Sequence, residues 1–396
     1  MQNDRIRELR AIPFFVPLAT AILFIGLGDA VTGSYMTLFA VDRAHLSPLA
    51  LGTFLTVLAL SSILVSTAFG HWFDRAPGRV PLFLALLMTT VGYALLTLTT
   101  QYHQLLLIAC LPLGTSAAAF PQLFAIAKGY LDDAGDATTE RGVAVLRALW
   151  SAAWAIGPAL GAIAIAAWGF SGVFLTTALS GFIASLIVLL ARVRVPNRTS
   201  ISKADLIPDR QSLRTVGLAA SSFILFHMAM FMGSIVLPIV VTRDLGGTKS
   251  DVGLIFSLCA LLEVLFLLKF VLRPSTQGYQ RWLSRGFVCF LLYFLTIFFL
   301  PSVAVLFVAQ ALRAAGIGLV GYLGIGYIQS SMPDRIGSAA ALFSNTVNAG
   351  SLLAGFAAGS LAQVFGYSSV FAACAGLSGL GWILFQVQLR LRETVR

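Results

Sequence analysis

Long apolar stretches alternate with short polar connections from one end of the chain to the other. Each stretch meets or approaches the ~20 residues that a helix needs to cross a hydrocarbon core of ~30 Å. The pattern therefore predicts an all-α membrane protein with twelve transmembrane helices. These helices are expected at residues 12–41, 48–70, 80–100, 104–128, 142–167, 170–191, 213–242, 250–272, 283–300, 303–331, 337–365 and 367–389.

Basic residues gather in every second connection between these stretches. Of the 26 lysines and arginines, 21 lie in the two termini and in alternate connections, including the long central one. The opposite set of connections holds only Arg43, Arg243 and Lys249. Because Lys and Arg accumulate in cytoplasmic loops, the distribution predicts that both termini and the central connection are cytoplasmic.

The composition leaves little room for a soluble catalytic domain. Hydrophobic residues make up 58% of the chain and charged residues 11%, which is far from the average of soluble proteins. Cytoplasmic loops that face anionic headgroups of the lipid bilayer explain the net charge of +10, so no nucleic-acid partner is expected. The four cysteines lack the spacing of a metal site, and hydrolase motifs do not occur. We therefore expect no metal, no other cofactor and no enzyme, and we expect a monomer.

The sequence divides into two related halves. A polar segment at 196–212 separates six predicted spans in residues 1–195 from six in residues 213–396. The segment 168–174 recurs as 365–371, each time between the fifth and sixth span of its half. Parallel repeats of six spans describe the major facilitator superfamily, which this chain therefore resembles. The resemblance implies two pseudo-symmetric six-helix halves.

A charged motif follows the second span and resembles the loop motif of the same superfamily. The resemblance implies that its Asp and Arg lock one conformation through the partial charge of a neighbouring helix end. The matching position of the second half has no Asp, so a symmetric lock is not expected. The conformational-lock motif consists of Gly70, Asp74, Arg75, Gly78 and Arg79.

The fifth span contains Gly157, Pro158 and Gly161, which resemble a motif associated with proton-driven exporters. Proline removes a backbone hydrogen bond, so a helix kink is expected at this point. Within the superfamily, segments of both halves resemble the bacterial sugar efflux transporters. That likeness implies export of sugars or sugar-like molecules across a bacterial inner membrane in exchange for protons. The matching segments are 121–125, 147–158, 261–263, 312–317 and 342–346.

Four charged residues lie more than one helical turn inside the predicted spans. A charge at the centre of a bilayer costs at least ~2.5–3.5 kcal/mol, so each one requires a reason. Carboxylates are the natural proton carriers, and Arg147 is expected to face Glu263 across the two halves. Alternatively, Arg147 and Glu263 form a permanent ion pair whose only role is to neutralise both charges within the membrane. The candidates for proton coupling or gating are Asp29, Arg147, Glu263 and Arg313.

Sugar recognition requires planar hydrogen-bonding groups and aromatic faces, because a sugar ring presents hydroxyls and an apolar C–H face. Several side chains of the predicted spans supply such groups. Ordinary hydrogen bonding and packing between helices is the alternative role for each of them. The substrate-binding candidates are Gln122, Trp150, Trp154, His227, Asn345 and Asn348.

Other functions stay open at this point. The Phe-rich second half favours a multidrug exporter of amphiphilic compounds, and the same fold also carries out proton-coupled uptake. A sensor without transport activity would need an effector domain, for which the chain has no room. The segment 246–250 resembles the end of a phosphate-binding loop but lacks its Gly-Lys step, so ATP-driven transport is not expected.

Overall fold

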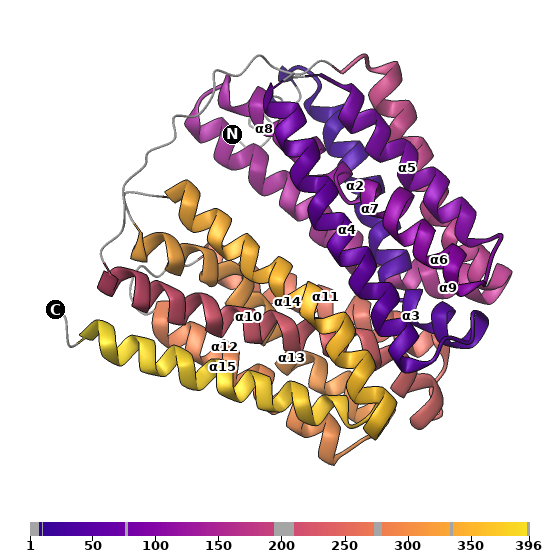
Figure 1. Ribbon diagram of the computed structural model, residues 1–396. Helices are drawn as coiled ribbons and strands as arrows, with labels where there is room; N and C mark the ends of the chain where they lie inside the picture. The colour runs from indigo at the N-terminus through magenta and orange to yellow at the C-terminus, as the bar shows by residue number, and fades with distance from the viewer. Residues whose placement is uncertain are drawn as a thin grey trace. The chain divides into compact units, whose positions relative to one another are not determined.

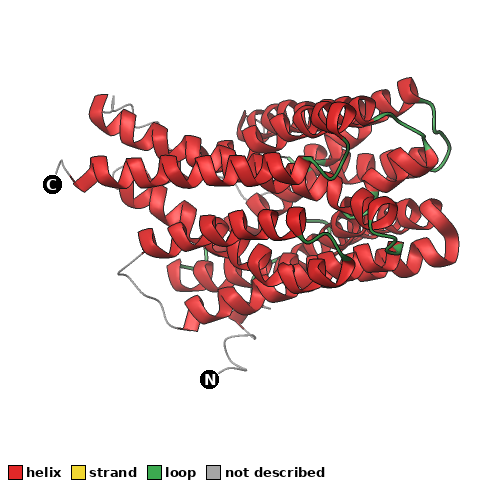
Figure 2. Ribbon diagram, turned by 90° about the horizontal axis from the view of Figure 1, so that it is seen from below, coloured by secondary structure: helices red, strands yellow, loops and turns green. Residues whose placement is uncertain are grey.

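The computed structural model describes residues 8–9, 11–75, 78–193, 210–272, 279–332 and 336–393. All regular elements within these ranges are helical (Figure 2). The chain divides into two compact units. Unit 1 consists of Met1–His45 and Val57–Ile201, and unit 2 consists of Leu46–Thr56 and Ser202–Arg396. The predicted limits of the halves, 1–195 and 213–396, stay a prediction, and most of the predicted linker 196–212 lies outside the described residues.

In unit 1, α2 and α8 pack against each other and against α9 (Figure 1). The α2–α9 pair is the most extensive helix contact among the described residues, and α5 also packs along α9. The elements are α2 (Phe15–Gly33), α3 (Met36–Leu38), the π-helix η1 (Phe39–Arg43), α4 (Pro48–Arg75), α5 (Val80–Leu96), α6 (Tyr102–Ile108), the π-helix η2 (Ala109–Leu113), α7 (Gly114–Ser116), α8 (Ala119–Asp132) and α9 (Asp136–Leu190). Helix α4 is divided between the units, and its residues 57–75 belong to unit 1.

In unit 2, α10 takes the central place that α2 has in unit 1. It packs against α14 and α15, while α12 packs against α13 and α15. The elements are α10 (Arg210–Ile239), the π-helix η3 (Val240–Asp244), α11 (Lys249–Leu272), α12 (Tyr279–Phe299), α13 (Val303–Ser331), α14 (Ile336–Phe365) and α15 (Val370–Glu393).

The predicted spans agree with the helices. Within the described residues, nine helical segments are long and apolar enough to cross a membrane. The remaining three predicted spans fall on α5, which is shorter at 17 residues, on α11, and on the part of α9 that follows Gly169. The chain is therefore an all-α, multi-pass membrane protein.

The internal repeat is visible in the backbone. Helix α9 is interrupted at Gly169, where φ is 62° and ψ is −159°. Gly366, the matching residue of the second half, also has a positive φ, of 83°. Glycine adopts this left-handed region without the steric penalty of a side chain. The two glycines therefore allow the chain to turn between the fifth and sixth span of each half.

Apolar side chains cover the outer face of α9. Leu175, Leu179, Phe182 and Leu186 recur every three or four residues and are all at least 40% exposed. Such spacing places them on one side of the helix. A contiguous apolar stripe of this kind marks a surface that faces something other than water. The stripe is the expected surface for contact with lipid.

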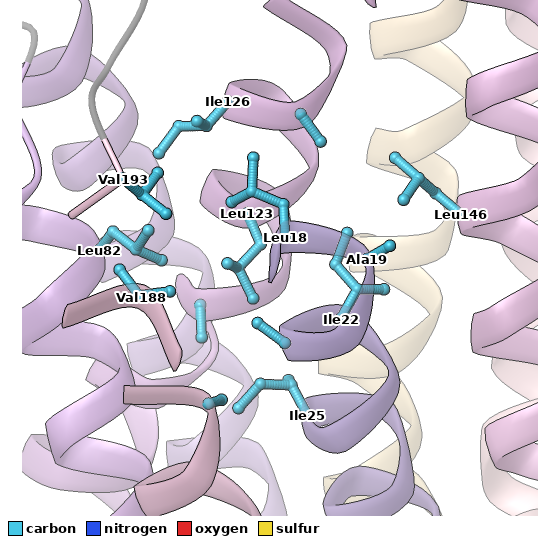
Figure 3. Close-up of a cluster of buried hydrophobic side chains, with 14 of the residues drawn as sticks. Leu18, Ala19, Ile22, Ile25, Leu82, Leu123, Ile126, Leu146, Val188 and Val193 are labelled. Atoms are coloured by element: carbon cyan, nitrogen blue, oxygen red, sulfur yellow. The ribbon is translucent and has the colours of Figure 1, made fainter. Parts of the chain in front are cut away.

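The core of unit 1 consists of aliphatic side chains from several helices. Leu18 and Ile22 of α2 meet Leu123 of α8 and Val188 of α9, and all four are at most 2% exposed (Figure 3). Burying each such side chain contributes roughly 1.5–3 kcal/mol relative to water. This cluster fixes α2, which carries Asp29, against α8 and α9.

The glycines of the predicted kink motif allow α2 and α9 to approach closely. A Cβ at Gly157 would lie 2.5 Å from Cβ of Ala30, and a Cβ at Gly161 would lie 2.5 Å from Cε2 of Tyr35. The Tyr35 hydroxyl also donates to the carbonyl oxygen of Pro158 at 3.2 Å. The motif thus has a packing role, while the kink at Pro158 stays a prediction.

Replacement of Gly161 by Ala is expected to destabilise the protein. The added methyl group overlaps the Tyr35 ring, and overpacking of this kind costs ~1–3 kcal/mol. Gly376→Ala is the matched control, because a Cβ there meets nothing within 4 Å. Thermal unfolding in detergent should show a lower melting temperature for Gly161→Ala only. Equal melting temperatures would contradict the close α2–α9 contact.

Candidate functional site

A cavity of about 340 Å³ opens within unit 1. Helices α2, α4, α5, α8 and α9 all contribute to its lining, together with the segment around α7. Ile25, Leu58, Leu113 and Phe120 form an apolar part of the wall. The polar and aromatic part is formed by Asp29, Ser62, Thr89, Tyr93, Ser116, Trp150 and Thr177.

Asp29 is the acidic residue of this cavity. It lies on α2, and its side chain is exposed. Among the described residues, no Lys, Arg or His lines the cavity. Tyr93 of α5 is close enough for the two groups to interact electrostatically. A carboxyl group among hydroxyls and without a basic neighbour can exchange a proton and can accept hydrogen bonds from a ligand.

The backbone next to Asp29 is held in place by Thr177. The Thr177 hydroxyl donates to the carbonyl oxygen of Gly28 at 3.0 Å and lies 2.5 Å from the hydroxyl oxygen of Thr32. A Cβ at Gly28 would lie 3.1 Å from Cγ2 of Thr177, so the helices are in close contact here. The position of Asp29 is therefore fixed by the contact between α2 and the second part of α9.

Trp150 forms an aromatic wall of the same cavity. Its ring centroid lies 4.1 Å from that of Phe120, and its Cε3 would lie 3.1 Å from a Cβ at Gly26. The structure thus brings together two residues predicted for different roles, Asp29 and Trp150. Trp154 lies one turn further along α9 against Gly33 and does not line the cavity.

Gln122 is buried on α8 at 5% exposure, and neither atom of its side-chain amide has a hydrogen-bond partner among the described residues. A buried amide without partners costs about 1–3 kcal/mol, so such groups are uncommon in proteins. Arg147 is exposed on α9 and does not line the cavity.

In unit 2, a buried arginine connects three helices. The guanidinium of Arg313, on α13, donates to the Ser234 hydroxyl of α10 at 2.8 Å and to Gln310 Oε1 at 3.4 Å. Its central carbon lies 4.9 Å from the ring centroid of Phe256 on α11. Hydrogen bonds and a cation–π contact therefore hold this charge in place.

Glu263 lies half-buried on α11, two turns after Phe256. Its Cγ would lie 3.5 Å from a Cβ at Gly318 of α13, so it also faces α13. The positive charge of Arg313 acts on this carboxylate. The predicted pairing of Arg147 with Glu263 involves both units and stays a prediction.

His227 occupies a helix crossing in unit 2. Its Nδ1 lies 3.3 Å from the Thr346 hydroxyl, and its ring meets the rings of Phe226 and Phe343 edge-on, with centroids 5.6 Å apart. A Cβ at Gly350 of α14 would lie 2.6 Å from Cβ of His227. These contacts favour the packing alternative for His227.

Two further groups of predicted residues lie on exposed surfaces. Asn345 and Asn348 are exposed on α14, on a different face from Thr346, which is buried. In the lock motif, Gly70, Arg75 and Arg79 are exposed and Gly78 is half-buried. The Asp74 side chain lies outside the described residues. The roles of both groups stay predictions.

Sequence reasoning missed the hydroxyl groups around Asp29. Ser62, Thr89, Tyr93 and Ser116 come from three separate elements, and each is inconspicuous among apolar neighbours. The four-residue spacing of Thr89 and Tyr93 was the available signal, because it places both on one face of a helix. Only the shared cavity shows that this face points toward Asp29.

Comparisons with known proteins cover nearly the whole chain. The sequence model of the Major Facilitator Superfamily matches residues 18–219 and 219–396. A protein of Deinococcus radiodurans that is named as a sugar efflux transporter is 40% identical over 94% of this chain and 97% of its own length. Sugar efflux transporter A of Escherichia coli is 29% identical over 89% of this chain and 91% of its own length.

Solved structures show the same fold at low sequence identity. A POT family transporter in complex with 5-aminolevulinic acid has a TM-score of 0.78 and 14% identity, and covers 95% of each chain. The nucleoside transporter NupG has a TM-score of 0.73 and 14% identity, and covers 96% of this chain and 99% of its own. These similarities concern the fold alone and agree with the predicted architecture.

Replacement of Gln122 by Met is expected to raise the melting temperature. The change removes a buried amide without partners and retains the side-chain volume, which corresponds to a gain of about 1 kcal/mol. Gln310→Met is the control, because the Gln310 amide bonds to Leu306 and Arg313, so its loss should lower the melting temperature. A decrease for both variants would show that Gln122 has a partner.

Proposed function

Because this chain belongs to the major facilitator superfamily, we propose that it exports sugars or sugar-like molecules across a bacterial inner membrane in exchange for protons. Membership of the superfamily makes it a transporter of small molecules and not an enzyme. The choice of sugars is supported by the names of relatives that match nearly the full length of the chain.

The proposed orientation places both termini in the cytoplasm. Its support is the concentration of basic residues in the termini and in alternate connections. In this orientation η1, η3 and the breaks at Gly169 and Gly366 lie at the outer side. We further propose that the protein works as a monomer, since each unit contains its own core.

The observation that carries the proposal is the chemistry of the cavity around Asp29. Sugar hydroxyls are donors for the carboxylate, and the Ser62 hydroxyl can donate to or accept from the same ring. The hydroxyls of Thr89 and Ser116 donate to backbone carbonyls and can accept hydrogen bonds from the sugar. The indole face of Trp150 suits the apolar C–H face of a sugar ring. A cavity with few convergent polar groups and an aromatic wall is the usual form of a small-molecule site.

We propose that Asp29 carries the transported proton and that Glu263 neutralises the positive charge of Arg313. Asp29 lies in a lining without basic residues, so its charge state is free to change during transport. Glu263 is under the influence of Arg313, and a negative charge there balances a buried positive one. Gln122 is retained as a ligand-binding candidate because its amide has no partner among the described residues.

A multidrug exporter is the second candidate function. The apolar part of the cavity wall, with Leu58, Leu113 and Phe120 beside Trp150, would also accept an amphiphilic compound. Proton-coupled uptake would use the same residues in the reverse direction, because gradients determine the direction of transport. Transport assays should therefore include an amphiphilic drug and both membrane orientations.

Asp29→Asn is expected to abolish accumulation that is driven by a proton gradient. The amide keeps the size and hydrogen-bonding capacity of the side chain but cannot exchange a proton. The measurement is uptake of labelled sugars into inside-out vesicles with an acidic lumen. Wild type should accumulate sugar until a protonophore is added, whereas Asp29→Asn should only equilibrate it. Asp29→Glu is the control and should keep part of the accumulation.

If Asp29→Asn accumulated sugar as fully as wild type, Asp29 would not be the residue that carries the proton. Accumulation of the amphiphilic drug without any sugar would identify a multidrug exporter. If neither compound accumulates in inside-out vesicles, uptake into right-side-out vesicles becomes the decisive assay.

Glu263→Gln is expected to lower stability without changing the pH dependence of transport. The substitution removes the negative charge that acts on the buried Arg313 guanidinium, so the free energy of unfolding should fall. The double variant Glu263→Gln with Arg313→Gln should recover part of the melting temperature. Loss of pH dependence at an unchanged melting temperature would instead make Glu263 the proton carrier.

A further inference from the structure

A second cavity of unit 1 lies just beyond the C-terminal end of α5, near the break in α9. It has a volume of about 430 Å³ and lies between η1, the segment after α5 and the turn at Gly169. Phe39 and Phe174 form an aromatic floor, with ring centroids 4.7 Å apart. The rim is polar and is formed by Arg43, Thr97, Thr99, Thr100 and Ser171, with Trp168 beside them.

Arg43 gives this cavity a positive charge. It is exposed at the last position of η1 and has no ion-pair partner in the part of the chain that the structure describes. The hydroxyls of Thr97 and Thr99 already bond to the chain, to Ala94 and Gln104 respectively. The guanidinium and the remaining hydroxyls are thus available as donors to a ligand.

The internal repeat shows what this place contains in unit 2. Asp244 ends η3 as Arg43 ends η1, and Ser368 corresponds to Ser171. In unit 2 the Ser368 hydroxyl donates to Asp244 Oδ2 at 2.5 Å, so donor and acceptor satisfy each other. In unit 1, Arg43 takes the position of Asp244, so a cation stands where unit 2 has a hydrogen-bond acceptor. A cavity lies at this place. A group that fits there must supply the missing acceptor and a negative charge.

Phosphate is the group that meets this requirement best. The planar fork of arginine donates two parallel hydrogen bonds to phosphate oxygens, and Thr100 and Ser171 can add hydroxyl donors. Trp168, which is 71% exposed, lies at the turn between two predicted spans. Tryptophan is enriched at the level of lipid headgroups, where phosphate is abundant.

We propose that this cavity binds the phosphate of a membrane phospholipid through Arg43, with Ser171 and Thr100 as further donors and Trp168 beside the headgroup. The site is separate from the cavity around Asp29 and does not depend on the identity of the transported substrate. Soluble phosphate has the same binding chemistry, so the experiment must separate the two sources.

The test is native mass spectrometry of the full chain in detergent during titration with phosphatidylglycerol. Wild type should bind one lipid about tenfold or more tightly than Arg43→Ala, since hydrogen bonds between charged groups contribute ~1.5–3 kcal/mol. Arg43→Lys keeps the positive charge but lacks the planar guanidinium. Its affinity for the lipid should lie between those of wild type and Arg43→Ala. Arg243→Ala is the matched control, because it removes an exposed arginine at the same end of unit 2, and it should bind like wild type.

Two further arms identify the bound group and its source. Diacylglycerol with the same acyl chains lacks phosphate, and wild type and Arg43→Ala should bind it equally weakly. If excess inorganic phosphate displaces phosphatidylglycerol, phosphate binding is supported with a soluble source; no displacement supports the lipid headgroup. Equal affinity of wild type and Arg43→Ala for phosphatidylglycerol, at equal melting temperatures, would overturn the proposal.

Discussion

Lipid tails offer no hydrogen-bond partners, so every polar group inside the bilayer must find a partner in the protein or lie in a cavity. Helices satisfy this constraint for the backbone, and side chains satisfy it where helices meet. Tyr35 bonds to the carbonyl of Pro158, Thr177 bonds to the carbonyl of Gly28, and Arg313 bonds to Ser234. In unit 1, the carboxyl group of Asp29 lies in a cavity instead, where a ligand can reach it.

Matching helix crossings of the two units contain different side chains. In unit 1, Gly26 meets Ala153 where α2 crosses α9; at the matching crossing of unit 2, His227 meets Gly350. The glycine lies on α2 in unit 1 and on α14 in unit 2, so the imidazole of His227 takes the place of Gly26. At the matching ends of η1 and η3, unit 2 has the Asp244–Ser368 hydrogen bond and unit 1 has a cavity lined by Arg43 and Ser171. The two units therefore share a backbone plan but differ in side-chain chemistry at matching places.

The sequence was sufficient for the helices, because twenty apolar residues in a row leave few alternatives. It also gave Asp29 and Trp150 as candidates, since an acid and an indole stand out in apolar segments. It could not show that they share a cavity, because this depends on how α2, α5 and α9 pack. Arg313 was predicted as a coupling residue, but its partners Ser234 and Phe256 lie far away in the sequence. The serines and threonines of the cavity could not be predicted, because isolated serines and threonines are common in membrane helices.

The π-helical turns at Phe39–Arg43 and Val240–Asp244 affect how the ends of these helices can evolve. A π-turn contains one more residue than an α-helical turn, so it rotates everything beyond it by about 100° relative to an uninterrupted helix. Deletion of a single residue within Phe39–Arg43 would restore α-helical register and turn Arg43 away from its cavity, while α2 and Asp29 kept their places. The residues at this end of each unit can thus change by insertion or deletion without any change in the preceding membrane helix.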